Sequence, residues 1–196
     1  MNADHSLHIT SSGTEALEGI RASGTGDDRM IEPNWYALLV RSRSEFVTAR
    51  ELGRKGIEHF LPTVTRQRQW ADRKKAVDFP LFPGYLFVHV RPSAQEFLSV
   101  RQAPGIVTLV SLEPNHPAVI PPEEIESLKL VLGNGTAFDV FPGLKDGTSV
   151  RIKRGPLQGA VGILEKRAGH DMFLVNIDIL GRCVGTKICA DDIEMA

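Results

Sequence analysis

The apolar residues of the first two thirds of the chain fall into runs of two kinds. Some runs are short and continuous, which is typical of strands, whereas others recur with the spacing of one helix face. The expected strands are 35–40, 57–63, 84–90 and 105–110, and the expected helices are 44–56, 93–103 and 121–132. A polar, basic excursion of hairpin type interrupts this order at 64–79. The pattern predicts an α+β fold, a sandwich in which helices pack on a small, mostly antiparallel sheet.

The ends of the expected helices carry residues that favour helix starts and stops. Ser44 is expected to cap the first helix and Gly56 to end it. Ser93 and Glu96 form a capping box at the start of the second helix. The third helix opens with two prolines and two glutamates and is followed by Gly133, which is the usual asymmetry of helix ends.

Beyond residue 132 the pattern changes. Residues 133–143 contain Gly and Pro but few charges and are expected to be an interdomain linker. Strand-like runs separated by Gly-containing turns follow at 148–152, 160–167, 171–180 and 183–188. Within 171–180 apolar and polar residues alternate, which gives one buried face. This density of short strands predicts a small β-barrel over 144–196, after a first domain over 34–132.

The first 33 residues are dominated by Ser, Gly, Thr, Asp and Glu. Their net charge is −4, because six acidic residues are balanced by only two arginines. Such a composition buries too little apolar area to offset the entropy of the chain. Residues 1–33 are therefore expected to be disordered.

Composition and charge exclude several functional classes. The net charge of −1 excludes a protein that coats polyanions with its whole surface, so any nucleic-acid contact must come from a local basic patch. Cys183 and Cys189 are too few for a four-ligand zinc site or a disulfide scaffold, and we expect them to be small buried residues. No apolar run approaches the roughly 18 residues of a membrane span, and no signal peptide is recognisable. We expect a cytoplasmic protein.

Catalytic chemistry is not expected. The six histidines are scattered, and the sequence has no HExxH, GxSxG, P-loop or GxGxxG motif. His89 lies in a strand-like run, where a packed side chain is more typical than a metal ligand. We therefore expect a monomeric binding protein that is not an enzyme and uses no cofactor or metal.

The stretch FPLFPGYLFVHV at 79–90 mixes aromatics with prolines before a continuous apolar run. Proline cannot donate to a sheet ladder, so only the second part is expected to be a central strand. The pair Pro83–Gly84 predicts a bend, beside which Phe82 and Tyr85 form an aromatic lip suited to anchoring a protein interface. The alternative is that all these aromatics lie in the core.

The stretch RQRQWADRKK at 66–75 is a second candidate site. It contains one acid, Asp72, an aromatic, Trp70, and five cations: Arg66, Arg68, Arg73, Lys74 and Lys75. Cations neutralise phosphates and an exposed aromatic stacks on a base, so the segment suits a single DNA strand. The alternative is a solvated hairpin with Trp70 packed on the sheet.

The stretch GTSVRIKRGPLQGAVGIL at 147–164 is typical of a strand, a loop and a second strand. Gly155 and Gly159 allow positive φ in the loop, and Pro156 stiffens it. The segment resembles the KOW motif of SH3-like barrels in transcription and ribosomal proteins.

Together with WYAL, FLP, PLFPGYLFV and PGIVTLV in this order, the KOW-like unit resembles the NusG/RfaH family of transcription elongation factors over 34–193. The resemblance implies an NGN domain followed by a KOW SH3-like β-barrel. It also implies that the first domain binds the clamp helices of the largest subunit of RNA polymerase and suppresses pausing or termination. The corresponding polymerase-binding residues are Trp35, Phe82, Pro83, Gly84 and Tyr85. For Trp35, the core and the interface are equally expected.

The resemblance implies two further contacts. In RfaH-type members the hairpin region contacts the non-template DNA strand in the transcription bubble, and QWADRKK…PLFPGY looks more like the specialised members associated with polysaccharide operons. The KOW loop is the surface through which members meet the termination factor Rho or a ribosomal protein of the small subunit. Its residues here are Gly155, Pro156, Leu157 and Gly159. Leu157 stands where housekeeping members often carry an aromatic, which favours antitermination.

A second interpretation starts from GYLFVHV, which approximates the RNP1 pattern of RNA-binding RRM domains. Pro83 and Leu86 depart from that pattern. On this interpretation the chain is an RNA- or ribosome-associated binding module that uses the KOW barrel and this strand.

Overall fold

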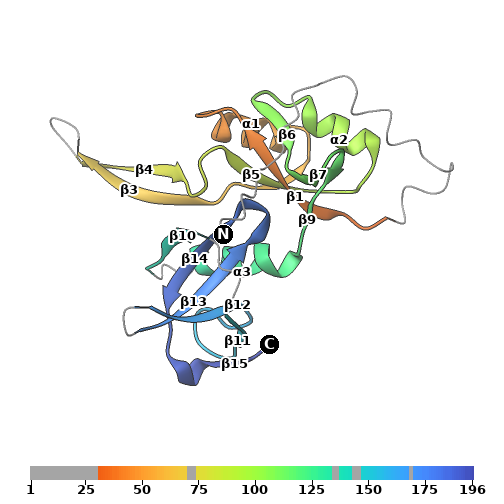
Figure 1. Cartoon of the computed structure of the whole chain (residues 1–196). Coiled ribbons are helices and arrows are strands. Elements are labelled where there is room, and N and C mark those ends of the chain that lie inside the picture. The colour runs from red at the N-terminus through yellow and green to blue at the C-terminus, as the bar shows by residue number, and fades with distance from the viewer. Residues whose placement is uncertain (1–30, 70–73, 134–136, 143–146, 168–169) are drawn as a thin grey trace, which may run out of the picture. The chain divides into compact units, whose positions relative to one another are not determined.

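The computed structural model describes residues 31–69, 74–133, 137–142, 147–167 and 170–196 (Figure 1). Contacts between residues divide the chain into two units. The N-terminal unit comprises 1–61 and 65–119, and the C-terminal unit comprises 62–64 and 120–196. Within the described part of the chain, every helix is too short or too polar to cross a membrane.

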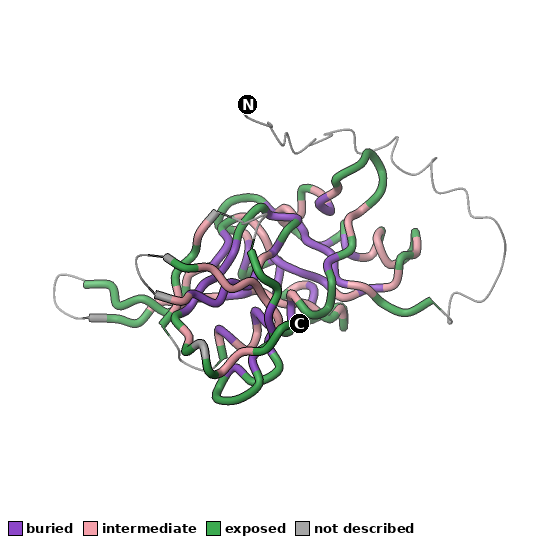
Figure 2. The backbone as a smooth tube through the Cα atoms, turned by 60° about the horizontal axis from the view of Figure 1, so that its bottom comes forward, coloured by how far each residue is buried: buried purple, intermediate pink, exposed green. Residues whose placement is uncertain are grey.

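The N-terminal unit is built on an antiparallel sheet with the strand order β2-β5-β1-β6. The strands are β1 (Asn34–Val40), β2 (Glu58–Phe60), β5 (Tyr85–Val90) and β6 (Ile106–Leu109), and two helices, α1 (Glu45–Arg54) and α2 (Ala94–Arg101), accompany them. One face of the sheet and the helices enclose a core that includes Tyr36, Leu38, Leu86, Val88, Leu52 and Val100. Because alternate residues of a strand point to opposite faces, the even-numbered residues of β1 and β5 form this core. Figure 2 shows the buried positions concentrated along these strands.

The basic excursion forms a hairpin of its own. Its strands are β3 (Thr63–Gln69) and β4 (Lys74–Pro80), which pair only with each other among the described residues. Thr65 Oγ1 donates a hydrogen bond of 2.6 Å to Asp78 Oδ1 across the hairpin. The distal half of β3 is exposed (Figure 2).

Three short strands of the N-terminal sequence region were not expected. They are β7 (Ser111–Glu113), β8 (His116–Pro117) and β9 (Val119–Ile120). β7 and β8 pair around a turn in which Asn115 has φ of 63°, a conformation that asparagine tolerates better than most residues.

The C-terminal unit contains a six-stranded antiparallel sheet with the order β10-β14-β13-β12-β11-β15. The strands are β10 (Asp139–Pro142), β11 (Thr148–Ile152), β12 (Val161–Arg167), β13 (His170–Ile177), β14 (Arg182–Lys187) and β15 (Ile193–Met195), and two 3-10 turns cover Asp178–Leu180 and Ala190–Asp192. The predicted α+β class with a β-rich second domain is confirmed. Residues 133–143, which were predicted to be an interdomain linker, contain β10, and this strand pairs with β14.

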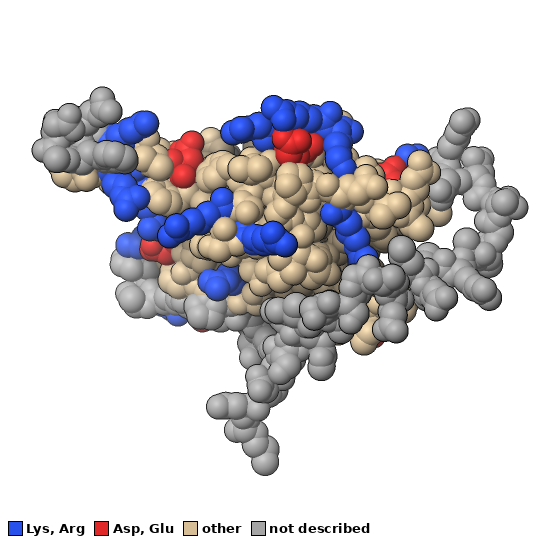
Figure 3. Space-filling model, turned by 90° about the horizontal axis from the view of Figure 1, so that it is seen from above, with Lys and Arg blue, Asp and Glu red and all other residues tan. Residues whose placement is uncertain are grey.

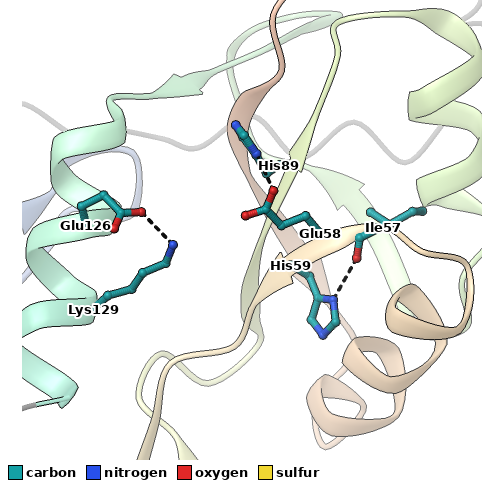
Figure 4. Close-up of polar contacts among 6 residues, drawn as sticks. All are labelled: Ile57, Glu58, His59, His89, Glu126 and Lys129. Carbon is teal, nitrogen blue, oxygen red and sulfur yellow. Dashed lines mark hydrogen bonds and ion pairs between the residues drawn. The ribbon is translucent and has the colours of Figure 1, made fainter.

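Helix α3 (Pro122–Gly133) lies on the C-terminal unit, although the sequence had placed it in the first domain. It contacts β12, β13 and β14. Its buried apolar side chains, Ile125, Leu128 and Val131, are fully covered. Ser127 Oγ accepts a 2.8 Å hydrogen bond from the Val161 amide, whereas Glu126 faces solvent and pairs with Lys129 at 2.7 Å (Figure 4). By its contacts, α3 is grouped with the C-terminal unit, whereas the predicted end of the first domain at residue 132 stays a prediction.

The expected helix caps are only partly present. The Ser93 hydroxyl accepts a 3.2 Å hydrogen bond from the Glu96 amide, as predicted. The Glu96 carboxylate completes no capping box and pairs with Arg91 instead, at 2.6 Å. Ser44 makes no side-chain capping bond.

Of the two cysteines, Cys183 is buried as expected, but Cys189 is exposed.

The first turn of α3 contains an unusual carboxyl group. Burial first, and then the nearby Asp178 carboxylate, raise the pKa of Glu124 from 4.5 to about 7, although the Asp178 amide, which donates to Glu124 Oε2 at 3.4 Å, opposes this shift. The folded chain therefore holds this proton more tightly than the unfolded chain does. The associated stability is complete below about pH 4.5 and is lost as the pH rises through about 7.

We expect Glu124→Gln to stabilise α3 on its sheet at pH 8 by about 1 kcal/mol, a value reduced from the full linkage energy because the carboxyl is partly exposed. At pH 3.5, below the ordinary pKa of 4.5, the variant and the parent should behave alike, because both side chains are then neutral in the folded and in the unfolded chain. Hydrogen exchange of the α3 amides, compared between the two proteins at each pH, measures this. Glu126→Gln, in the same helix but in a surface ion pair, is the control. An equal effect of both substitutions at pH 8 would contradict the assignment.

Candidate functional site

The second face of the N-terminal sheet is aromatic. The cross-strand pairs Trp35–His89, Ala37–Phe87 and Leu39–Tyr85 lie on it, because they alternate with the core residues of β1 and β5. Phe60 extends this row, since it is paired with Phe87 across β2 and β5. We call these residues, with Phe82, the aromatic face.

Contacts between neighbouring rings connect the residues of the aromatic face. Trp35 stacks on His89 with 4.8 Å between ring centroids and 20° between planes. Phe87 lies between two phenylalanines, stacked on Phe60 at 6.2 Å and met edge-on by Phe82 at 6.3 Å. Such offset and edge-on pairs add to the stability that comes from burying the rings.

His89 is fixed from its other side as well. Its Nδ1 lies 2.8 Å from Glu58 Oε2, so the ring donates to this carboxylate when Nδ1 carries the proton (Figure 4). The prediction that His89 is a packed strand residue is correct. Its packing depends on Glu58, which sequence reasoning did not single out.

The FPGY stretch is a tight turn ahead of β5. The Tyr85 amide donates to the Phe82 carbonyl at 3.0 Å, which closes a four-residue turn. Gly84 has φ of 85°. Proline at the second position and a positive φ at the third are the features of a type II turn, which explains why Pro83 and Gly84 stand in this order.

Two bonds attach this turn to the unit. The Gly84 amide donates to Glu45 Oε1 at 2.8 Å, and the Gly84 carbonyl accepts from the Val40 amide at 2.8 Å. Glu45 is only 4% exposed and occupies the first position of α1, where a negative charge is favourable. Sequence reasoning did not identify Glu45. The only signal was an acid in the first turn of a helix, which is common.

The turn exposes only part of the predicted lip. Pro83 is exposed, and Gly84 and Tyr85 are half-buried. Phe82, at 1% exposure, does not face outward but packs on Phe87, and Trp35 is also buried. Pro83 and Tyr85 are therefore the members of the predicted set that a partner can reach in this conformation.

The hairpin presents its described cations to solvent. Arg66 and Arg68 are exposed and lie on one face of β3, because they are two residues apart. Lys75 is exposed on β4. Trp70 and Arg73 lie outside the described residues, as does the side chain of Lys74.

The loop between β11 and β12 has the predicted glycine geometry. Gly155 and Gly159 have φ of 88° and 90°, and both are exposed together with Pro156. Leu157 is 6% exposed, so its side chain points inward and is not part of the loop surface. The start of the loop is held by Arg154, whose Nε donates to Asp192 Oδ1.

The RNA-binding interpretation of β5 stays a prediction. Of the aromatics in its RNP1-like stretch, Phe87 is fully buried among Phe60 and Phe82, whereas Tyr85 is half-buried. Among the residues that the structure describes, no three His, Cys, Asp or Glu side chains are placed to hold a metal ion.

Comparisons with known proteins identify the family. The family model described as "Transcription termination factor nusG" matches residues 33–129. The transcription termination/antitermination protein NusG of Lactococcus lactis is 27% identical over 139 residues, which are 68% of this chain and 72% of that protein. The protein of the same name from Halalkalibacterium halodurans is 23% identical over 164 residues, or 78% and 92% of the two chains. A solved structure described as "Domain interaction in Thermotoga maritima NusG" aligns with 84% of this chain and 97% of its own, at 23% identity and a TM-score of 0.43. The predicted family is confirmed: the chain belongs to the NusG family and has a role in transcription.

Proposed function

We propose that this protein is an elongation or antitermination factor that binds RNA polymerase through its N-terminal unit and recruits a second factor through its C-terminal unit. The observation that carries the proposal is the turn at Phe82–Tyr85, which presents Pro83 and Tyr85 beside an aromatic sheet face. The turn lies inside the segment that matches the NusG family. The partner is the pair of clamp helices of the polymerase's largest subunit.

The chemistry of the turn suits a helical partner. Tyr85 offers a half-buried ring whose conformation is already fixed, so little side-chain entropy is lost on binding. Pro83 adds an apolar surface that is rigid for the same reason. Small, preorganised anchors of this kind contribute most of the affinity in many protein interfaces.

Binding of this kind acts on the polymerase by selecting a conformation. A protein that holds the clamp in its closed position stabilises that state by the difference between its affinities for the closed and open forms. Paused and terminating complexes that need the clamp to move then become less populated. No catalytic group is required, which agrees with the non-enzymatic character expected of the chain.

The hairpin is the proposed contact with the non-template DNA strand. Its exposed cations, Arg66, Arg68 and Lys75, stand on two paired strands that carry one described acid, Asp78. Asp78 accepts a hydrogen bond from Thr65 and keeps its charge, so the described side chains of the two strands have three exposed cations against one acid. Cations aligned along a narrow projection suit a single strand of phosphates.

The C-terminal loop is the proposed site for the second factor, either Rho or a ribosomal protein of the small subunit. Pro156 and the backbone of Gly155 and Gly159 form its surface. Leu157 acts from inside by anchoring the loop. A partner that binds this loop therefore meets backbone groups, the Pro156 ring and the exposed side chains of Arg154 and Gln158, and no large apolar side chain.

We expect Tyr85→Ala to weaken binding to purified RNA polymerase about tenfold, because an interface anchor of this size contributes roughly 1–2 kcal/mol. Equilibrium binding of the full chain to core enzyme measures the loss, with circular dichroism as the check on folding. Leu112→Ala, which removes a side chain that is 65% exposed on β7, is the matched control. Unchanged affinity of the folded Tyr85→Ala protein would show that the turn is not the contact.

Replacing Arg66, Arg68 and Lys75 together with Gln should weaken binding to single-stranded DNA and flatten its salt dependence. The slope of log K against log salt should fall by about 2, because each lost phosphate contact removes about 0.7 from it. Arg101, Lys153 and Lys187 are exposed on other elements, and their replacement with Gln controls for total charge. Equal changes of slope in both triple variants would remove the hairpin from the interface.

A further inference from the structure

Helix α1 has an outward face that the proposed function does not use. Phe46 and Val47 are 41% and 48% exposed, and Arg50, Arg54 and Lys55 are exposed after them. Residues separated by three, four, seven or eight positions share one side of a helix, so Phe46, Val47, Arg50 and Arg54 form a single surface. We call these four residues with Lys55 the cationic face of α1.

The surroundings add to its positive charge. Arg41 and Arg43 are exposed in the turn before α1, and Arg43 has φ of 66°. Of the acids of the helix, Glu45 is buried against Gly84. Glu51 pairs with Arg54 at 2.6 Å and offsets that cation, whereas Arg41, Arg43 and Arg50 are exposed. Figure 3, which views the molecule from above, shows more Lys and Arg surface (blue) than Asp and Glu surface (red).

The N-terminal segment enters the unit close to this face. Trp35 and Glu58 both pair with His89, on opposite sides of β5. Glu58 follows α1 after a few residues, so the last turn of α1 lies at the end of the sheet where β1 begins. The residues that precede Asn34 therefore join the sheet at the end near Arg54 and Lys55.

The length of the segment is sufficient. A helix of ten residues is about 15 Å long, whereas a chain of about 30 residues can reach up to roughly 100 Å. Tethering also gives the segment an effective concentration in the millimolar range, so a weak affinity is enough for occupancy.

The composition of the segment complements the face. Residues 1–33 have a net charge of −4. The stretch TEALEGI at 14–20 alternates acids with the apolar residues Leu17 and Ile20. Acids next to aliphatic side chains match arginines next to Phe46 and Val47, in charge and in polarity.

We propose that residues 1–33 bind in cis to the cationic face of α1, with Glu15 and Glu18 toward its arginines and Leu17 and Ile20 toward Phe46 and Val47. The segment is then an internal competitor that any polyanion must displace from this side of the N-terminal unit. This interaction does not depend on the proposed polymerase contact, because it uses the opposite side of the sheet from the aromatic face.

The test places a spin label on the segment of the full chain. The label is attached at Ser12→Cys in a protein that also carries Cys189→Ser, since Cys189 is exposed and Cys183 is buried. We expect paramagnetic broadening of the amide signals of α1, strongest near Arg50 and Arg54 and reduced at high salt. Changing Glu15 and Glu18 to Gln, with Asp27 and Asp28 to Asn, should lower the broadening at least about threefold.

The reciprocal variant and its control make the result specific. Arg50→Gln with Arg54→Gln should also lower the broadening about threefold, whereas Arg101→Gln with Lys187→Gln should leave it unchanged. Adding single-stranded DNA should compete with the segment and reduce the signal in the parent protein. Absent or uniform broadening, or broadening that neither charge variant changes, would overturn the proposal. DNA-induced shifts in α1 without any label effect would assign the face to nucleic acid instead.

Discussion

The hydrogen bond from the Gly84 amide to the Glu45 carboxylate determines how the N-terminal unit is assembled. It joins the start of β5 to the start of α1, two points 39 residues apart in the chain. The partner bond from Val40 to the Gly84 carbonyl fixes the end of β1 at the same place. A buried carboxylate without such a donor would be strongly destabilising. The position of Glu45 therefore requires the Gly84 amide to point inward, and the type II turn provides this.

The turn explains why prolines interrupt an otherwise apolar strand. Pro83 has no amide to donate, and it occupies the turn position where none is needed. Gly84 adopts the positive φ, after which Tyr85 begins β5 in register with Leu39. This register places Phe87 and His89 on the aromatic face and Leu86 and Val88 in the core. One local turn thus separates the aromatic face from the hydrophobic core of the same strand.

The sequence predicted well those elements that apolar periodicity defines. Strands β1 and β5 and helices α1 and α2 lie within a few residues of their expected bounds, because each has a continuous or periodic apolar pattern. β7, β8, β9 and β15 have two or three residues each, too few for a periodic signal. β10 was missed because Gly and Pro surround it. The packing of α3 on the C-terminal sheet depends on which apolar surface it meets, and a helix pattern does not specify that.

The residue types of the candidate site were predicted more reliably than the question of which of them are exposed at its surface. The FPGY stretch and the KOW-like loop were found, but Phe82 and Leu157 proved to be buried anchors of their turns. Aromatic and aliphatic residues serve both purposes, and only tertiary packing distinguishes them. Glu45 and Glu58 could not be singled out, since the partners that define them, Gly84 and His89, are distant in sequence.

The most direct test of the proposed polymerase contact is site-specific photocrosslinking from the exposed turn. A photoreactive amino acid at Pro83, in the otherwise unchanged chain, should crosslink to the largest subunit of RNA polymerase in an assembled elongation complex. The same group at Lys187, exposed on β14, serves as the comparison position. A crosslink from position 83 that maps to the clamp helices is the expected result. Crosslinks from position 83 only to nucleic acid, or to no component while the protein remains bound, would contradict the account.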